Sequence, residues 1–255
     1  MSNRFNLNFK KNTMKKNIKF WGLSLILAAG LASCESDEAD YQKDATKNVG
    51  GYAFLTDQTI SSFDKNEDLN IDLYTDSGVT VNAVDVIQDG SSIASATVGD
   101  ENASFNASAF GDFAIDDEFD IMLESQLSNG NMAQDPFTVS VVSPISLDSD
   151  NPSGLTLDSI SNGAAIDYST YTLSAPIDSA ELFLKKNSDG TYSNSGAEVS
   201  TEGGSIELAD TNYQELNLMT NDTLYYEFTV MSGSLSESDS SYVVIQEEEE
   251  EEMEE

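Results

Sequence analysis

The chain has 255 residues, with 46 acidic side chains against 11 basic ones and a formal net charge of −35. Such a surface repels nucleic-acid phosphates, so DNA and RNA are excluded as partners. There is no histidine and one cysteine, which excludes His-dependent triads, ordinary zinc sites and a disulfide framework. We therefore expect a protein that is not an enzyme.

A basic and then apolar segment predicts a secretory signal peptide over residues 1–33. Its apolar run, residues 20–32, is shorter than the about 20 residues that span a bilayer. The run ends at Leu31, Ala32, Ser33 and Cys34, which resemble a bacterial lipobox. The resemblance implies cleavage after Ser33 and a lipid on Cys34, through which the membrane is a partner. An uncleaved anchor with an incidental cysteine is the alternative, and the true start could be Met14.

An acidic tether is expected over residues 34–50. Its first part, residues 35–40, resembles the acidic export signal of surface-displayed lipoproteins in the Bacteroidota. The resemblance implies an outer-membrane protein exposed on the cell surface; a plain solvated tether is the alternative. Six of the basic residues and none of the acidic ones lie before Cys34, which leaves the rest of the chain at a net charge of −41.

Short alternating runs separated by Gly, Asn, Asp and Ser predict an all-β fold in the remainder. A first domain is expected over residues 51–144, with a tight turn at Asp89-Gly90 and a closing hairpin around residues 128–131. Its expected strands are 69–73, 79–86, 93–98, 103–107, 119–124 and 137–141.

A second domain, residues 145–246, repeats this plan with a turn at residues 187–190 and a closing hairpin around residues 232–234. Its expected strands are 171–174, 180–184, 205–208, 224–230 and 241–245. The order of strands resembles tandem bacterial Ig-like or fibronectin-III-like domains, including those of Bacteroidota surface lipoproteins. The resemblance implies two Ig-like β-sandwiches, although the Cys…Trp…Cys core of true Ig domains is absent. An acidic tail, residues 247–255, is expected to be disordered because its like charges repel one another.

Two groups of residues are candidate ligand sites. Asp148, Asp150 and Asn151, at the expected domain junction, are similar to the acidic calcium linker of cadherins, which implies Ca²⁺ as a cofactor; a Pro-bearing turn is the alternative. Residues 64–72 also alternate acids and amides as a calcium loop does, but Leu69 and Thr75 stand where that loop needs Gly and Glu.

Tyr225 and Tyr226 are the second candidate, as ligand-binding residues of a glycan platform. Because they are adjacent on an expected strand, one must face outward if the other faces inward. The alternative is that tyrosines of this domain are core and edge residues.

These features predict a non-catalytic, lipid-anchored cell-surface protein that serves as spacer and recognition module for an outer-membrane protein or other surface partner. The alternative is a glycan-binding accessory lipoprotein of a polysaccharide uptake system. A carboxylate-based glycosidase would need two acids about 5–10 Å apart in a cleft.

Overall fold

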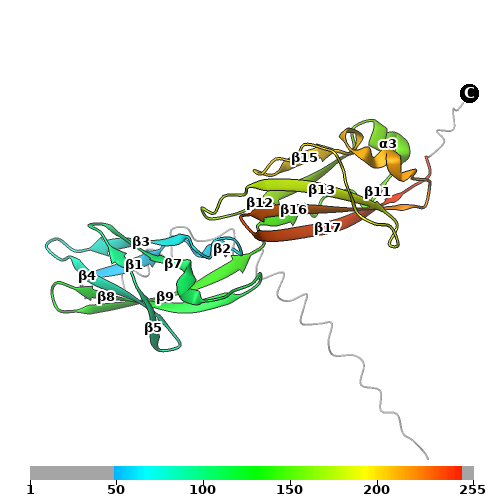
Figure 1. Ribbon diagram of the computed structural model, residues 1–255. Coiled ribbons are helices and arrows are strands. Elements are labelled where there is room, and N and C mark those ends of the chain that lie inside the picture. Colours follow the sequence, from blue (N-terminus) through cyan, green and yellow to red (C-terminus); the bar gives the residue numbers. More distant parts are fainter. Residues whose placement is uncertain (1–48, 249–255) are drawn as a thin grey trace, which may run out of the picture. The chain divides into compact units, whose positions relative to one another are not determined.

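The computed structural model describes residues 49–248, and these residues belong to one compact unit. The predicted signal peptide, Cys34, most of the tether and nearly all of the acidic tail lie outside the described residues. The predicted all-β class is confirmed: the strands form four sheets in two pairs, each pair a β-sandwich (Figure 1). The helical segments described are short, namely α3 (Leu157–Ser161), η1 (Ala107–Phe110), η2 (Leu208–Asp210) and η3 (Asn212–Leu216).

The first sandwich is made of β1 to β9. One sheet has the order β1 (Gly51–Leu55), β3 (Asp68–Thr75), β7 (Asn102–Asn106) and β6 (Thr97–Val98). The facing sheet has the order β2 (Thr59–Ser61), β9 (Met132–Val142), β8 (Glu118–Leu127), β4 (Val81–Gln88) and β5 (Ser91–Ser95). Neighbouring strands are antiparallel except β2 and β9, which are parallel.

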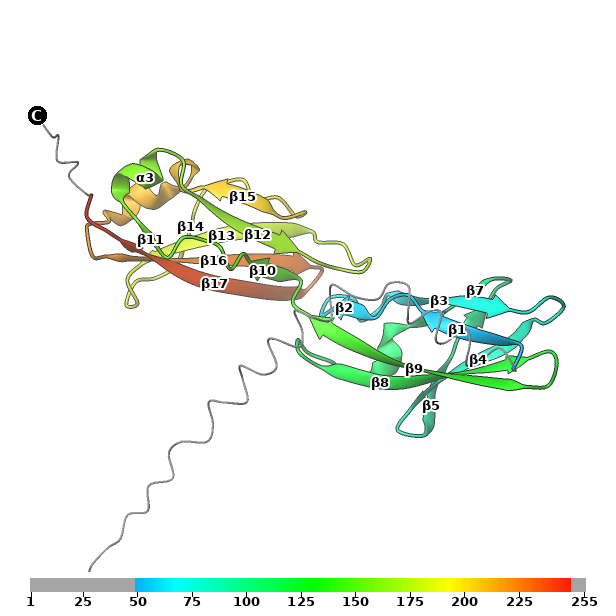
Figure 2. The ribbon, with the colours of Figure 1, turned by 180° about the vertical axis from the view of Figure 1, so that it is seen from behind.

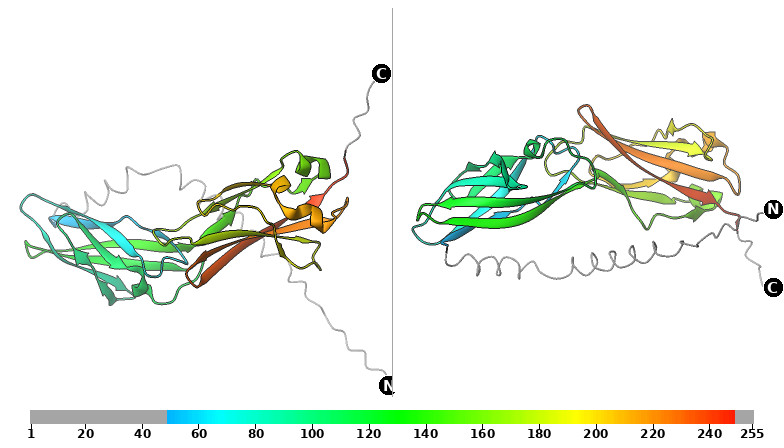
Figure 3. Two further views of the ribbon diagram at one scale, coloured as in Figure 1. Left: turned by 45° about the horizontal axis from the view of Figure 1, so that its top comes forward. Right: turned by 90° about the horizontal axis from the view of Figure 1, so that it is seen from below.

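The second sandwich is made of β10 to β17. Its smaller sheet, seen in Figure 2, has the order β10 (Ile145–Leu147), β12 (Ala165–Thr170) and β15 (Gly204–Glu207). The larger sheet has the order β11 (Gly154–Leu155), β17 (Leu235–Ile245), β16 (Thr223–Ser232), β13 (Ser179–Lys186) and β14 (Ser193–Asn194). The hairpin of β16 and β17 can be followed in Figure 3 by its orange and red colours.

Both sandwiches follow one topology. The order β1-β3-β7-β6 opposite β9-β8-β4 is the ABED-opposite-GFC order of immunoglobulin-like sandwiches. The second sandwich repeats it as β10-β12-β15 opposite β17-β16-β13, without a counterpart of β6 in the described residues. In each, a short strand then pairs in parallel with the last strand, β2 with β9 and β11 with β17. The predicted tandem of two similar sandwiches is therefore confirmed.

Each sandwich has its own apolar core, which the alternating strands supply. In β3, Leu69, Ile71 and Leu73 face inward while their neighbours are exposed or half-buried, as the alternation predicts. In the second core, the rings of Tyr168 and Phe228 stack across the two sheets with centroids 4.4 Å apart.

Several local predictions are confirmed. Asp89 and Gly90 both have positive φ, 51° and 76°, as a type I′ hairpin turn requires. The two closing hairpins also form, with strands longer than expected, β8–β9 and β16–β17.

Two strand predictions are wrong. The expected strand 93–98 is divided: β5 pairs with β4 in one sheet, and β6 pairs with β7 in the other. The chain thus changes sheets at Ala96, whose N–H still bonds the carbonyl of Val84. Residues 171–174 are not a strand but the start of the loop after β12, because Leu173 and its neighbours serve other contacts, described below.

Candidate functional site

The predicted lipidation site cannot be placed in the fold. Cys34, with Leu31, Ala32 and Ser33, lies outside the described residues, so cleavage and lipidation stay predictions. Between residues 49 and 248, no helix is long and apolar enough to cross a membrane.

The two predicted ligand-binding tyrosines lie on opposite faces of β16. Tyr226 is 1% exposed and belongs to the core of the second sandwich, where burial raises the pKa of its hydroxyl. Tyr225 is half-buried on the outer face of the sheet. Burial removes Tyr226 from the surface, so of the two residues only Tyr225 can meet a ligand there.

Tyr225 is part of a row that crosses the strands of the larger sheet. It lies directly opposite Lys185 of β13 on one side and Tyr242 of β17 on the other. Tyr192, just before β14, continues the row, because the next residue, Ser193, pairs with Leu184. We call Tyr192, Lys185, Tyr225 and Tyr242 the tyrosine row.

Ring contacts hold the tyrosine row together. The Lys185 ammonium lies over the Tyr192 ring at 4.3 Å and over the Tyr225 ring at 5.0 Å from the centroids. The Tyr225 and Tyr242 rings are 5.6 Å apart and tilted by 43°. A cation over an aromatic face is attracted by the ring quadrupole, so Lys185 fixes two rings at once. Tyr242 is the most open member, with 53% of its surface exposed.

The charge environment of the row is unusual for this chain. Of the three lysines in the described part, Lys65 pairs with Asp112 and Lys186 pairs with Asp222. For Lys185, the described residues supply aromatic rings but no carboxylate partner. Burial raises the pKa of Tyr192, and Glu227 and Tyr225 add to the rise, so its hydroxyl stays protonated at neutral pH. The row therefore presents apolar ring faces, phenolic hydroxyls and one ammonium that has no carboxylate partner there.

Sequence reasoning noted the tyrosines of this domain, Tyr192 and Tyr242 included, but it singled out Tyr225 and Tyr226 and did not predict which residues adjoin Tyr225. Lys185 and Tyr192 are distant from Tyr225 in sequence and reach it only through the register of three strands. The alternation of residues 180–184 does place position 185 on an outer face, but the strand opposite it is not readable from the sequence.

The predicted calcium residues lie in a turn that follows β10. The Asp148 carboxylate accepts the N–H of Asp150 at 2.9 Å. The Asn151 side chain bonds both backbone groups of Asp167, each at 2.7 Å. In residues 49–248, no group of three or more Asp, Glu, His or Cys side chains is placed to hold a metal ion. Calcium binding here stays a prediction, and the visible role of these side chains is to fix the turn.

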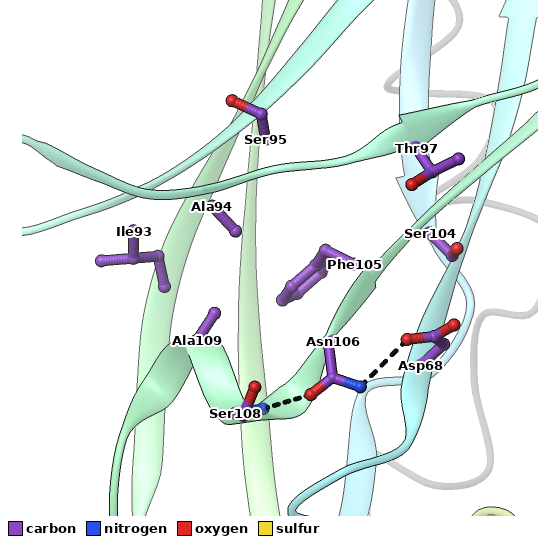
Figure 4. Close-up of a pocket in the computed structure, with 10 residues that line it drawn as sticks. All are labelled: Asp68, Ile93, Ala94, Ser95, Thr97, Ser104, Phe105, Asn106, Ser108 and Ala109. Carbon is purple, nitrogen blue, oxygen red and sulfur yellow. Dashed lines mark hydrogen bonds between the residues drawn. The ribbon is translucent and has the colours of Figure 1, made fainter.

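A shallow hollow of about 410 Å³ lies on the first sandwich between β5, β7 and η1 (Figure 4). The Ser95 hydroxyl in its lining already donates to Asp85 at 2.6 Å. Asn106 donates to Asp68 at 3.1 Å and accepts the N–H of Ser108 at 3.0 Å. None of the predicted site residues lines it.

No protein-family model and no curated protein matches this sequence. Among solved structures, the fibronectin(III)-like modules of Clostridium thermocellum CbhA are 11% identical, with a TM-score of 0.26 over 76% of this chain and 94% of that one. The titin domains Z1Z2 are 13% identical, with a TM-score of 0.26 over 76% and 96%. A 1.5-MDa bacterial ice-binding adhesin is 14% identical, with a TM-score of 0.27 over 77% and 63%. Similarity at this level carries no argument about function, and the fold assignment rests on the strand order itself.

Proposed function

We propose that this protein is a non-catalytic, lipid-anchored protein of the outer membrane and cell surface, with one sandwich as spacer and the other as recognition module. The observation that carries the recognition role is the tyrosine row, an outward-facing set of aromatic rings on the second sandwich. Aromatic residues are enriched at protein interfaces because they bury much apolar area and still offer a polar group. The lipid anchor is supported by the sequence at Leu31 to Cys34.

The anchor is tested in cells that carry the full chain. We expect wild-type protein to incorporate labelled palmitate and to be digested when protease is added to intact cells. Cys34→Ser should lose the label and leave the membrane fraction, whereas the neighbouring change Ser36→Ala should not. Wild-type protein that stays unlabelled, or is protected until the outer membrane is opened, would contradict the anchor or the surface exposure respectively.

The recognition role is tested by placing a photoreactive phenylalanine analogue at Tyr242 and, as a matched control, at Tyr74. Both are exposed tyrosines, 53% and 44% respectively, but Tyr74 lies on the first sandwich. We expect crosslinked products on cells from position 242 and not from position 74. Equal products from both positions, or none from 242, would argue against the row as the recognition surface.

A glycan-binding accessory of an uptake system is the second candidate, favoured by the same rings. Flat ring faces stack on the C–H faces of sugar rings, while phenolic hydroxyls and the Lys185 ammonium can hydrogen-bond to sugar oxygens. Affinity gel electrophoresis against neutral and acidic polysaccharides distinguishes it from protein recognition. Retardation that Tyr225→Ala and Tyr242→Ala remove and Tyr74→Ala keeps would support this candidate. If no polysaccharide retards the wild-type protein, the glycan-binding candidate is refuted and the proposal of a protein partner stands.

A further inference from the structure

Asp64 is an aspartate of the first sandwich whose side chain is fully shielded from solvent. It lies in the turn between β2 and β3. Its Oδ2 accepts the N–H and the hydroxyl of Ser61, both at 2.7 Å. Within its own sandwich, the carboxylate thus closes a local turn. Its remaining lone pairs can accept hydrogen bonds from other donors.

Backbone N–H groups of the second sandwich donate to the remaining lone pairs of Asp64. The N–H of Leu173 donates to Oδ2 at 2.9 Å, and those of Ser174 and Ala175 donate to Oδ1 at 3.3 and 3.0 Å. Three consecutive amides of the loop after β12 therefore surround one carboxylate. A buried carboxylate needs such donors, because burial alone strongly disfavours its charge.

The charge state agrees with this geometry. Burial raises the pKa of Asp64, but the hydrogen bonds from Leu173, Ser61 and Ala175 outweigh it, and the pKa lies below its ordinary value of 3.8. Asp64 is therefore an anion at neutral pH. It also has no acceptor to spare for the calcium loop that the alternation of residues 64–72 suggested.

Near the same carboxylate, each sandwich places one apolar side chain against the core of the other. Phe63, next to Asp64 in the first sandwich, is 4% exposed and is part of the core of the second. Leu173 of the second sandwich packs against the core of the first. The Tyr171 hydroxyl donates to the carbonyl of Thr59 at 2.7 Å, and Ser62 donates to Glu237 at 3.2 Å.

We propose that Asp64, with the contacts around it, locks the two sandwiches together as one rigid body through protein groups alone. Tandem domains that share few contacts move freely about their linker, which is the default expectation. Here, separation would expose Phe63 and Leu173 and would break the three amide bonds to Asp64 together. This proposal of rigidity does not depend on the proposed function. Only the use of the rigid pair of sandwiches as a stiff spacer rests on that function.

Double electron–electron resonance measures this rigidity in the chain from residue 34 on, with Cys34→Ser so that no other thiol is present. Spin labels are attached at Ser91→Cys in β5 and Ser236→Cys in β17, both exposed positions. The buffer contains EDTA, so that a bound metal ion cannot supply the stiffness. The control is Asp222→Ala, because Asp222 also accepts a backbone N–H, that of Met219, but all its partners are in the second sandwich.

We expect a narrow distance distribution in the wild type and in Asp222→Ala, and a distribution at least twice as broad in Asp64→Ala. A broad wild-type distribution in EDTA, or an Asp64→Ala distribution as narrow as the wild type, would overturn the proposal. If circular dichroism finds Asp64→Ala unfolded, Asp64→Asn takes its place, since it keeps the size of the side chain but replaces one of the two oxygens that accept the loop amides by an NH₂ group. Broadening there supports the proposal, and an unchanged width refutes it. Ligand binding is not measured, so failure of the proposed function would not affect the result.

Discussion

The neighbours Tyr225 and Tyr226 provide a matched pair of substitutions with opposite expected consequences. The side chain of Tyr226 is among the largest that are fully buried, and it lies opposite Leu184 and Ser241 on the neighbouring strands. Tyr225 faces outward, and its ring contacts Lys185 and Tyr242 of the tyrosine row. Replacing each by alanine removes the same number of atoms from the same strand. A difference in the loss of unfolding free energy between the two variants therefore shows which side chain faces the core.

The magnitudes follow from these surroundings. Truncating a large buried aromatic residue costs about 3–5 kcal/mol, through lost transfer energy and the cavity left behind. Tyr226 is among the largest fully buried side chains, so we expect the upper part of that range. Tyr225→Ala loses one exposed aromatic pair and one exposed cation–π contact, together about 1–2 kcal/mol.

Urea unfolding followed by far-ultraviolet circular dichroism measures both losses. Tryptophan fluorescence is unsuitable, because the chain's single tryptophan, Trp21, lies in the predicted signal peptide. We expect the free energy of unfolding to fall at least twice as far in Tyr226→Ala as in Tyr225→Ala. Equal losses, or a larger loss in Tyr225→Ala, would refute the assignment of inner and outer faces and with it the tyrosine row.

Two further predictions concern pH. A hydrogen bond with Lys186, and next one with Asn187, lowers the pKa of Asp222 to about 2. A lowered folded-state pKa gives stability that is lost as the pH falls from about 3.8 towards 2. The urea midpoint of Asp222→Asn should therefore fall less than that of the wild type between pH 5 and pH 2.5. An equal fall in both would contradict this. Burial raises the pKa of Asp135 despite its bond from the N–H of Ala53, so this carboxylate destabilises the native state as the pH rises above its ordinary value of 3.8. Asp135→Asn keeps an acceptor without the charge, and its urea midpoint should exceed that of the wild type at pH 7, with a gap that narrows towards pH 4; a lower midpoint at pH 7 would show that the charge is stabilising.

The elements that could be predicted from the sequence are those whose own residues decide them. Alternation over residues 69–73 and 224–230 fixes which side chains face the core, and Asp89-Gly90 suits only a turn with positive φ. Residues 171–174 have side chains typical of a strand, yet the amides of Leu173 and Ser174 donate to Asp64, more than 100 positions earlier in the chain. No local pattern carries that information, because the sequence does not state which distant carboxylate will meet them.

The division of residues 93–98 between two sheets has a similar cause. Alternation continues through Ala96, and only the facing sheets determine where the chain crosses from one to the other. In the tyrosine row, the sequence predicts only that Tyr225 and Tyr226 face opposite sides of the sheet, because they are adjacent on one strand. Its contacts with Lys185 and Tyr242 depend on the register of β13, β16 and β17, which no single strand specifies.

The shared topology of the two sandwiches has a consequence for how the chain reaches its native state. Adjacent domains of like topology are prone to exchange strands while they fold, since a segment of one can enter the corresponding place in the other. Here the corresponding strands carry different side chains: β8 supplies Ile121 and Leu123 to its core, whereas the matching β16 supplies Tyr226 and Phe228. A strand placed in the wrong sandwich would leave voids or overfill the core. Divergence between the two halves thus protects each from misassembly with its neighbour.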